Sequence, residues 1–415
     1  MRIKELNLNN FRGIKSLNLV FSTNQNVVVL VGINGVGKSS ILDYINLSIR
    51  YYSQVSEKHS FYGNKQLVVD HNILESDIYL GTNITLNHTG VELSNGMDAN
   101  WTMIGIKDCN DDDEERLDYF IETLNKSENN IILSAWEELT DRYFYYLSNR
   151  QFIDLTGADS TKAKNIIDFK SFSKWFKETE DLENERRLSD NIEYRHPLLK
   201  AVRQAIYSVL GDGYGNLTFK RAIDKIVIKK LGQEIALELL SDGEKNLLAM
   251  VGHLSRRLAE EYDRFENKLD DSSIVLIDEI ELHLHPEWQR MIIPRLTKTF
   301  PNCQFIVTTH SPQVLSHVDP ECIHILDYDG DNVIVKRPES SYGLDSNRIL
   351  EDILGVSKRP QEIQDRMLEL FRTINNNDLV SAKEIVRELG DRIGINEPEL
   401  VKAEATIKRR EIIGR

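Results

Sequence analysis

Gly32-Ile-Asn-Gly-Val-Gly-Lys-Ser39 is the stretch that decides the fold of this 415-residue chain. A buried strand is predicted before it, because residues 27–31 are apolar and mostly β-branched, and a helix is predicted after it. Strand, glycine-rich turn and helix in this order form a loop whose backbone N–H groups surround phosphate oxygens. Lys38 then places a positive charge against the β- and γ-phosphates, and Ser39 offers a hydroxyl to Mg²⁺. The stretch therefore predicts an α/β fold with a nucleoside-triphosphate site.

The spacing of the glycines separates this loop from the dinucleotide-binding alternative. It is G-x-x-G-x-G, whereas the dinucleotide fingerprint is G-x-G-x-x-G and gives no role to a following Lys-Ser pair. The helix that begins here adds a partial positive charge to the site. We expect these residues of the loop to bind the nucleotide: Gly32, Asn34, Gly35, Gly37, Lys38, Ser39 and Ser40.

The composition is typical of a soluble globular protein. Hydrophobic residues make up 40% and charged residues 28% of the chain, and no apolar run approaches the length of a membrane span. We expect no secretory signal, and the three scattered cysteines favour a reducing compartment. The net charge of −15 argues against a protein that binds nucleic acid over its whole surface. Basic clusters at 170–187 and 408–415 are interpreted as solvated faces.

A second set of polar residues begins at Leu240-Ser-Asp-Gly-Glu244, ahead of an amphipathic helix. Ser241 and Glu244 have the S-x-x-E spacing of a capping box, which marks the start of that helix. A helix start that carries a serine and a glycine is also an anion-binding surface. Taken alone, the segment favours the capping role.

Two apolar strands end in groups that suit phosphate chemistry. Residues 273–277 lead into Asp278 and Glu279, where the first carboxylate can hold Mg²⁺ and the second can polarise an attacking water. Residues 305–309 lead into His310, whose ring can reach a γ-phosphate. For each strand alone, a turn-forming aspartate or a hydrogen-bonded loop histidine is the alternative.

Taken together, the Leu240–Glu244 segment, the strand that ends in Asp-Glu and the Thr309-His-Ser311 strand end resemble the ABC/SMC superfamily of ATPases. Asn10-Phe-Arg12 is similar to a segment near the start of SMC-like heads. The resemblance implies a mixed α/β ATPase head that uses ATP and Mg²⁺. In that superfamily the LSxGE segment of one subunit closes over the nucleotide on the P-loop of another.

The resemblance also implies roles for individual residues. The catalytic residues would be Lys38, Glu279 as general base and His310. The nucleotide would be contacted by Arg12 and, from the second copy, by Ser241, Gly243 and Glu244. Mg²⁺ would be held by Ser39, Asp278 and a Q-loop glutamine, for which Gln151 is our candidate.

His283-x-His285 with Asp278 is an alternative metal site. It is disfavoured, because the two histidines already fit the loop that the superfamily has after the general base, and no third, well-placed neutral ligand appears.

The pattern along the chain predicts four parts. They are an N-terminal ATPase lobe with the P-loop and an antiparallel β subdomain (1–114), a helical insertion (115–215), a C-terminal ATPase lobe (216–335) and a helical C-terminal module (336–415). In the second lobe, 223–228 and 234–239 alternate like a hairpin. No heptad run is long enough to predict an extended coiled coil.

Within the superfamily, a transporter subunit is disfavoured because about 200 residues separate the P-loop from the LSxGE segment, and SMC proteins are disfavoured by the missing coiled coils. The tail beyond 330 lacks the acidic cluster of the OLD-type nuclease domain. Residues 146–150, 172–187 and 341–348 resemble the PtuA family, the ATPases of Septu phage-defence systems. For 172–187, an amphipathic helix packed on the head is an equally good interpretation.

The PtuA resemblance implies an even-numbered homo-oligomer of ATPase heads and a separately encoded HNH nuclease similar to PtuB. Nucleic acid would be reached through that complex, with no membrane partner. Two alternatives stay open: an SMC-like DNA repair or maintenance ATPase, and a scaffold that binds ATP and hardly hydrolyses it.

Overall fold

The computed structural model describes residues 2–22, 25–58, 84–92, 98–106, 143–146, 152–153, 169–189, 192–261 and 269–413. The chain divides into two compact units, Met1–Ile349 and Leu350–Arg415. Among the described helices, none is long and apolar enough to cross a membrane.

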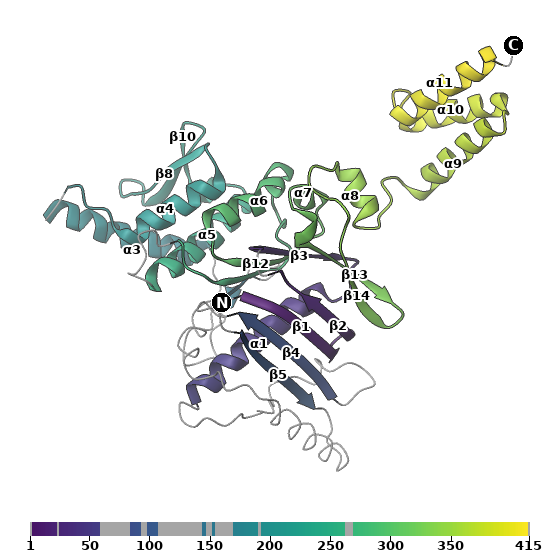
Figure 1. Ribbon diagram of the computed structural model, residues 1–415. Coiled ribbons are helices and arrows are strands. Elements are labelled where there is room, and N and C mark those ends of the chain that lie inside the picture. The colour runs from purple at the N-terminus through teal and green to yellow at the C-terminus, as the bar shows by residue number, and fades with distance from the viewer. Residues whose placement is uncertain are drawn as a thin grey trace. The chain divides into compact units, whose positions relative to one another are not determined.

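A central sheet carries the P-loop (Figure 1). The middle five of its seven described strands run parallel, and the two outer strands pair antiparallel. Parallel strands end at one edge of a sheet, so the residues that follow β3, β11 and β12 come together there. In order, the strands are β14 (Asn332–Lys336), β13 (Ile323–Asp329), β3 (Val27–Gly32), β12 (Gln304–Thr308), β11 (Ile274–Ile277), β6 (Tyr143–Tyr146) and β7 (Phe152–Ile153).

An antiparallel sheet and helix α1 (Lys38–Lys58) lie on one side of the central sheet (Figure 1). The order of the strands is β2 (Ile14–Val20), β1 (Arg2–Phe11), β4 (Ile84–Glu92) and β5 (Asp98–Ile106). Ile41 and Tyr44 of α1 are buried in one core with Leu6 of β1 and Leu30 of β3. The start of α1, which carries Lys38 and Ser39 of the P-loop, is therefore held between two sheets. The predicted α/β fold with an antiparallel β region is confirmed.

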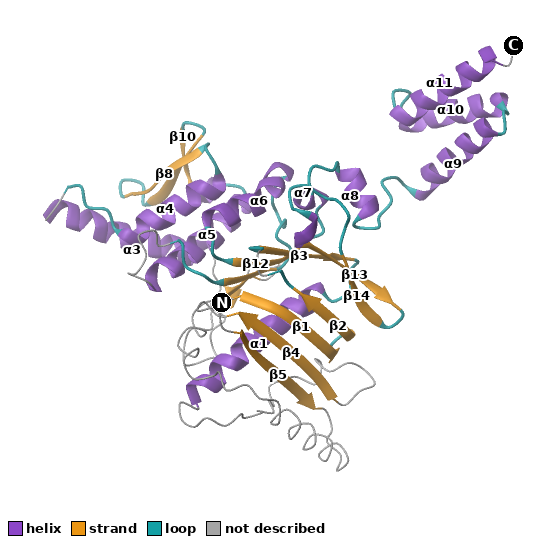
Figure 2. Ribbon diagram, in the orientation of Figure 1, coloured by secondary structure: helices purple, strands orange, loops and turns teal. Residues whose placement is uncertain are grey.

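The other side of the central sheet is mainly helical (Figure 2). Its helices are α3 (Phe169–Ser189), α4 (Pro197–Leu210), α5 (Asp242–Glu261), α6 (Pro286–Thr299) and α7 (Pro312–Leu315). A small sheet lies against α3 and α4 and consists of β10 (Gln233–Ala236), β9 (Lys225–Lys230) and β8 (Tyr214–Lys220).

Strand β8 was missing from the sequence-based prediction. The pairing of β8 with β9 shifts register between Gly215 and Thr218, and Asn216 has a φ of 48°. This irregularity breaks the polar–apolar alternation that reveals a strand. The predicted strand at 234–239 is also too long, because β10 ends at Ala236 and Leu237–Leu239 forms a single 3₁₀ turn.

The second unit is a small helical body with its own core. Helix α8 (Ser346–Asp352) spans its boundary, and α9 (Gln361–Asn375), α10 (Leu379–Ile393) and α11 (Pro398–Ile413) follow. All three later helices contribute buried side chains to one cluster, including Leu370, Leu389 and Ala403. The helical C-terminus that the sequence predicts is confirmed.

Candidate functional site

The P-loop is closed tightly around its own lysine. Gly32 has a φ of 152°, and a Cβ at this position would lie 2.4 Å from the carbonyl oxygen of Leu326 on β13. Only glycine fits there. Nζ of Lys38 donates hydrogen bonds of 2.9 Å to the carbonyl oxygens of Gly32 and Ile33, so the ammonium group lies inside the curve of the loop.

The electrostatics of Lys38 favour an anion at this position. Burial lowers the pKa of Lys38, while the carboxylates of Asp278, Glu279 and Glu281 raise it. The residue is only 7% exposed. A partly desolvated ammonium group whose hydrogen bonds go to carbonyl oxygens gains strongly from a phosphate.

Asp278 follows β11 and faces the first turn of α1. Oγ of Ser39 lies 3.1 Å from both carboxylate oxygens of Asp278. Thr308, at the end of β12, donates a 2.6 Å hydrogen bond to Asp278 Oδ1 and accepts one of 2.8 Å from the backbone N–H of Glu279. A hydroxyl and a carboxylate in direct contact are the oxygen donors that Mg²⁺ prefers, so Ser39 and Asp278 fit the predicted ion.

The groups predicted from three separate segments line one pocket of about 210 Å³. Glu279 lies in it with a φ of 49°, a left-handed conformation that non-glycine residues adopt rarely. The lining residues are Asn34, Gly35, Gly37, Lys38, Ser39, Ser40, Asp278, Glu279, Thr308 and His310.

His310 is placed in the pocket through its backbone. Glu281 accepts hydrogen bonds of 2.7 Å from the backbone N–H of His310 and from Oγ1 of Thr309. Burial and the nearby Lys38 lower the pKa of His310, and the surrounding carboxylates raise it. The lowered pKa favours a neutral ring, which can donate one hydrogen bond to a phosphate oxygen.

Three residues of the LSxGE segment line a second pocket of about 330 Å³. Ser241, Gly243 and Glu244 line it with Tyr214, Lys230 and Trp288, among others. Within the described part of the chain, the two pockets have no lining residue in common. The capping box is present as well, because Ser241 N–H donates to Glu244 Oε2 at 2.9 Å and Glu244 N–H donates to Ser241 Oγ at 3.4 Å.

Arg12 is not brought to the P-loop pocket. Its guanidinium pairs with Asp43 of α1, and the other oxygen of Asp43 accepts a 2.7 Å hydrogen bond from Tyr145 of β6. The lining residues of the P-loop pocket do not include it among the residues that the structure describes. The nucleotide contact of Arg12 stays a prediction.

Two other predictions concern metal ligands. Gln151 lies outside the described residues. For His283 and His285, no group of three or more His, Cys, Asp or Glu side chains in the described ranges could hold a metal ion. Nδ1 of His285 instead accepts a hydrogen bond of 3.4 Å from the Glu287 backbone N–H at the start of α6.

Three residues of the site were missed from the sequence. Thr308 and Glu281 position the strand ends, and the Tyr328 hydroxyl at the end of β13 donates a 3.0 Å hydrogen bond to the Gly35 carbonyl oxygen. For Thr308 the sequence held a signal, because the Thr308-Thr309 pair before His310 predicts a polar end to the strand. Tyr328 gave no signal, because β13 and the P-loop are far apart in the sequence.

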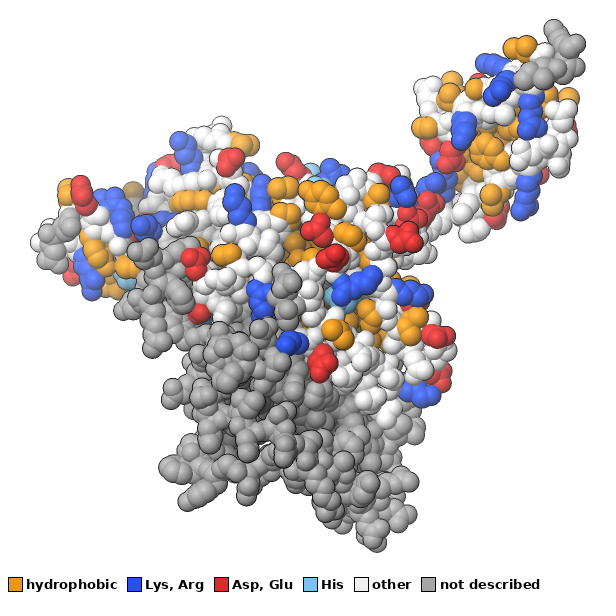
Figure 3. Space-filling view, in the orientation of Figure 1, with side chains coloured by type: hydrophobic (Ala, Val, Ile, Leu, Met, Phe, Trp, Pro, Cys, Tyr) orange, Lys and Arg blue, Asp and Glu red, His pale blue; other side chains and the backbone are white. Residues whose placement is uncertain are grey.

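The basic cluster at 170–187 is largely paired. Lys174 and Lys177 contact Glu178 and Asp224, and Arg186 donates to the Tyr194 hydroxyl. Figure 3 likewise shows acidic and basic side chains interspersed over the face in view. These contacts agree with the interpretation of the cluster as a solvated face.

Comparison with known proteins places these features in a family. Residues 107–316 match the family model AAA_21, described as "AAA domain, putative AbiEii toxin, Type IV TA system". The "Retron Ec83 probable ATPase" of Escherichia coli is 30% identical, over 99% of this chain and 87% of that protein. The "Retron Vc95 probable ATPase" of Vibrio cholerae serotype O1 biovar El Tor is 26% identical, over 90% and 82%.

The predicted kinship with PtuA is real but is shared with these retron proteins. "Septu protein PtuA" of Bacillus thuringiensis is 28% identical, over 86% of this chain and 85% of that protein. The Ec83 ATPase matches more of the chain at higher identity, so PtuA is not the better match. Among solved structures, the SMC head bound to the C-terminal winged-helix domain of ScpA has a TM-score of 0.45 at 15% identity, over 81% of this chain and 97% of that one.

Proposed function

The chain belongs to the AAA_21 family of P-loop ATPases, and on that basis we propose that it is the ATPase subunit of a bacterial anti-phage defence complex. Retron and Septu proteins are its relatives, and the residues that line the P-loop pocket include the groups needed for hydrolysis. The observation that carries the proposal is the meeting of Lys38, Asp278 and Glu279 in one pocket.

Each lining residue has a proposed task. The P-loop backbone and Lys38 bind the β- and γ-phosphates, and Ser39 and Asp278 hold Mg²⁺, which neutralises phosphate charge when bound. Glu279 accepts a proton from the attacking water, and the neutral His310 donates a hydrogen bond toward the γ-phosphate. Gln151 remains our candidate for the Q-loop.

The separation of the two pockets supports a site shared between copies. Ser241 and Gly243 line a pocket distinct from that of Lys38, so we propose that they act on the nucleotide bound by a second copy. This requires a dimer of heads, or a multiple of it. We further propose that the chain consists of four parts, 1–114, 115–215, 216–335 and 336–415, and that the protein is cytoplasmic.

The partner is proposed to be a separately encoded HNH nuclease similar to PtuB, whose action on nucleic acid depends on the nucleotide state of this chain. The resemblance to PtuA supports this choice. Pull-down of the tagged chain expressed with its neighbouring genes, followed by native mass spectrometry, tests it. A stoichiometric HNH protein on an even-numbered core is expected. A lone dimer that binds DNA only with ATP would instead favour an SMC-like maintenance ATPase.

Hydrolysis is tested with Glu279→Gln. Phosphate release is expected to fall by at least about 100-fold, because the general base is lost, while binding of a fluorescent ATP analogue is retained. Glu339→Gln, at an exposed position, is the matched control and is expected to match the wild type. Equal phosphate release from Glu279→Gln and the wild type would contradict the assignment, and no release from the wild type would leave the scaffold alternative.

A further inference from the structure

The β8–β10 sheet reaches the LSxGE segment through two side chains. Tyr214, the first residue of β8, and Lys230, the last residue of β9, are paired across the sheet. Both donate hydrogen bonds to Oε1 of Glu244, that of Lys230 at 2.7 Å. Two neighbouring strand ends therefore contact the same carboxylate oxygen at the start of α5.

The second carboxylate oxygen of Glu244 accepts its hydrogen bonds from Ser241. Oε2 accepts a hydrogen bond of 2.9 Å from the Ser241 N–H and one of 2.7 Å from the Ser241 hydroxyl. Burial acts to raise the pKa of Glu244, but the hydrogen bonds from Lys230, Tyr214 and Ser241 outweigh it and bring the pKa to about 2. The ionised Glu244 therefore connects the β8–β10 sheet, through Oε1, to Ser241, through Oε2.

The segment is fixed from a third direction. A Cβ on Gly243 would lie 2.2 Å from the carbonyl oxygen of His283, so the segment packs directly against the loop before α6. The ring of Trp288 on α6 meets the Tyr214 ring edge-on, with 5.9 Å between centroids. Ser241 therefore has little freedom to move without Glu244 and Tyr214.

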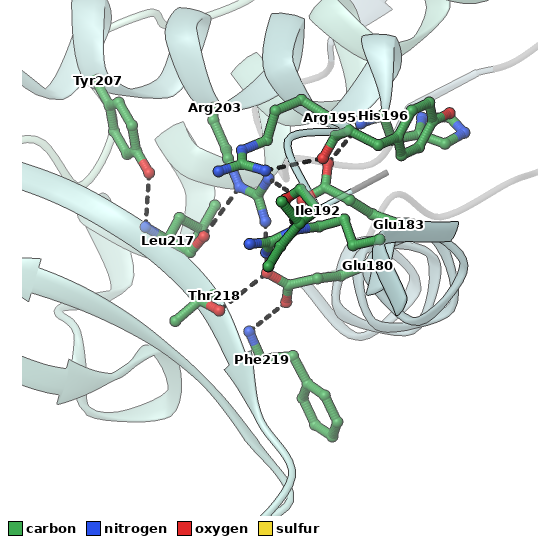
Figure 4. Close-up of polar contacts among 12 residues, drawn as sticks. Glu180, Glu183, Ile192, Arg195, His196, Arg203, Tyr207, Leu217, Thr218 and Phe219 are labelled. Carbon is green, nitrogen blue, oxygen red and sulfur yellow. Dashed lines mark hydrogen bonds and ion pairs between the residues drawn. The ribbon is translucent and has the colours of Figure 1, made fainter. Parts of the chain in front are cut away.

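The sheet is anchored at its other side by a buried ionic network (Figure 4). Arg203 of α4 pairs with Glu180 and Glu183 of α3, which are 4% and 3% exposed. Glu180 also accepts hydrogen bonds from the hydroxyl of Thr218 and the backbone N–H of Phe219 on β8. Because a buried ion pair is costly to break, β8 is held firmly to α3 and α4.

The charge of Glu244 presents a problem for a serine that must contact a phosphate. Ser241 has one hydroxyl proton, and both an ionised Glu244 and a phosphate would attract it. An uncompensated carboxylate there would also repel the phosphate. Lys230 supplies a matching positive charge, and Tyr214 a second hydrogen bond, so both effects are reduced.

We propose that Tyr214 and Lys230 are positioning residues for the LSxGE segment. They hold Glu244 and neutralise its charge, so that the Ser241 hydroxyl can bind the nucleotide of a second copy. This inference rests on the proposed function. It makes the β8–β10 sheet, with its anchor on α3 and α4, part of the hydrolytic machinery.

The test compares Lys230→Gln, Lys230→Arg and Tyr214→Phe with Ser241→Ala and the wild type in the full chain. Measured are kcat for phosphate release, KM for ATP, self-association of each chain with ATP, and the melting temperature. Lys229→Gln, an exposed neighbour on β9, is the control. Binding of a fluorescent ATP analogue to dilute protein reports on the P-loop alone.

We expect Lys230→Gln to lower kcat on the order of 10-fold and to weaken ATP-dependent self-association. The variant loses a charged hydrogen bond to Glu244, and the negative charge of Glu244 is then no longer balanced. Tyr214→Phe is expected to have a smaller effect in the same direction, and Lys230→Arg to restore most of the activity. Binding to the P-loop and the control variant should match the wild type. Removing both charges, with Glu244→Gln and Lys230→Gln together, should restore part of the association that Lys230→Gln loses.

Three results decide against the inference. If Ser241→Ala lowers kcat while Lys230→Gln and Tyr214→Phe equal the wild type, the positioning role is wrong and the proposed function stands. If these variants lower only the melting temperature, the cluster is a helix cap alone. If the wild type does not hydrolyse ATP and does not self-associate when ATP is present, the proposed function fails, and the positioning role fails with it.

Discussion

Lys38 combines a buried ammonium group with hydrogen bonds to two carbonyl oxygens of its own loop. Replacing it with methionine removes the charge while keeping most of the length of the side chain. We expect Lys38→Met to weaken ATP binding and to lower turnover by at least about 100-fold, because the phosphates lose their main point charge. Isothermal titration with ATP checks the binding. Lys15→Met, at a half-exposed lysine paired with Asp331, is the control. Unchanged affinity in Lys38→Met would contradict the assignment of the loop.

His324 on β13 is 1% exposed and predicts a pH dependence of stability. Burial, assisted by Arg337, lowers its pKa to about 4 from an ordinary value of 6.5. The unfolded chain therefore takes up a proton between pH 6.5 and 4 that the folded chain does not. The stabilisation is complete above pH 6.5 and is lost as the pH falls through that window.

Between pH 7.5 and 5, this single group is expected to contribute a loss of about 2 kcal/mol in the free energy of unfolding. Urea denaturation of the wild type and of His324→Leu at both pH values measures it. The variant should lose less stability than the wild type over the same interval. Equal losses would show that His324 is protonated as readily in the folded as in the unfolded chain.

At the scale of elements, α3 and α5 approach closely at Gly252. A Cβ there would lie 2.4 Å from Cε2 of Phe172, which packs on Trp175 and Phe176. Although alanine is the better helix former, Gly252→Ala is expected to destabilise the chain by about 1–3 kcal/mol, because the ring must move.

A double-mutant cycle tests this contact. Phe172→Leu in the Gly252→Ala background should recover part of the lost stability, which chemical denaturation measures. Gly215→Ala, where nothing lies within 4 Å of a Cβ, is the comparison for a glycine without a close neighbour. Additive effects of the two substitutions would rule out the steric clash as the cause.

The elements also show what could be predicted from the sequence. Local patterns identify β3, β11 and β12, and parallel strands must bring their ends together, so the grouping of Lys38, Asp278 and His310 follows from topology. Strand β8 escaped prediction because a register shift interrupts its alternation. The Arg12–Asp43 pair and the Tyr328–Gly35 hydrogen bond join distant segments, and only tertiary packing determines such contacts.

At the scale of the whole molecule, each of the two units has its own buried core. We expect a chain that ends at Ile349 to bind ATP with unchanged affinity, and the fragment 350–415 to be helical and to unfold cooperatively. A 66-residue helical body is near the lower size limit for independent folding, so its stability should be modest, at a few kcal/mol. Circular dichroism melts and ATP titration check both parts. Loss of ATP binding on truncation would show that the first unit depends on the second.

A catalytic centre shared between two copies, as we propose, would make the protein a sensor of its own abundance. When most copies are single, the number of complete centres rises with the square of the total concentration, so halving the dose lowers the rate about four-fold. A few copies in a cell would leave the ATP pool almost untouched. A higher concentration of the protein, or its recruitment to a common scaffold, would raise the rate of ATP hydrolysis steeply, with no change to any individual chain.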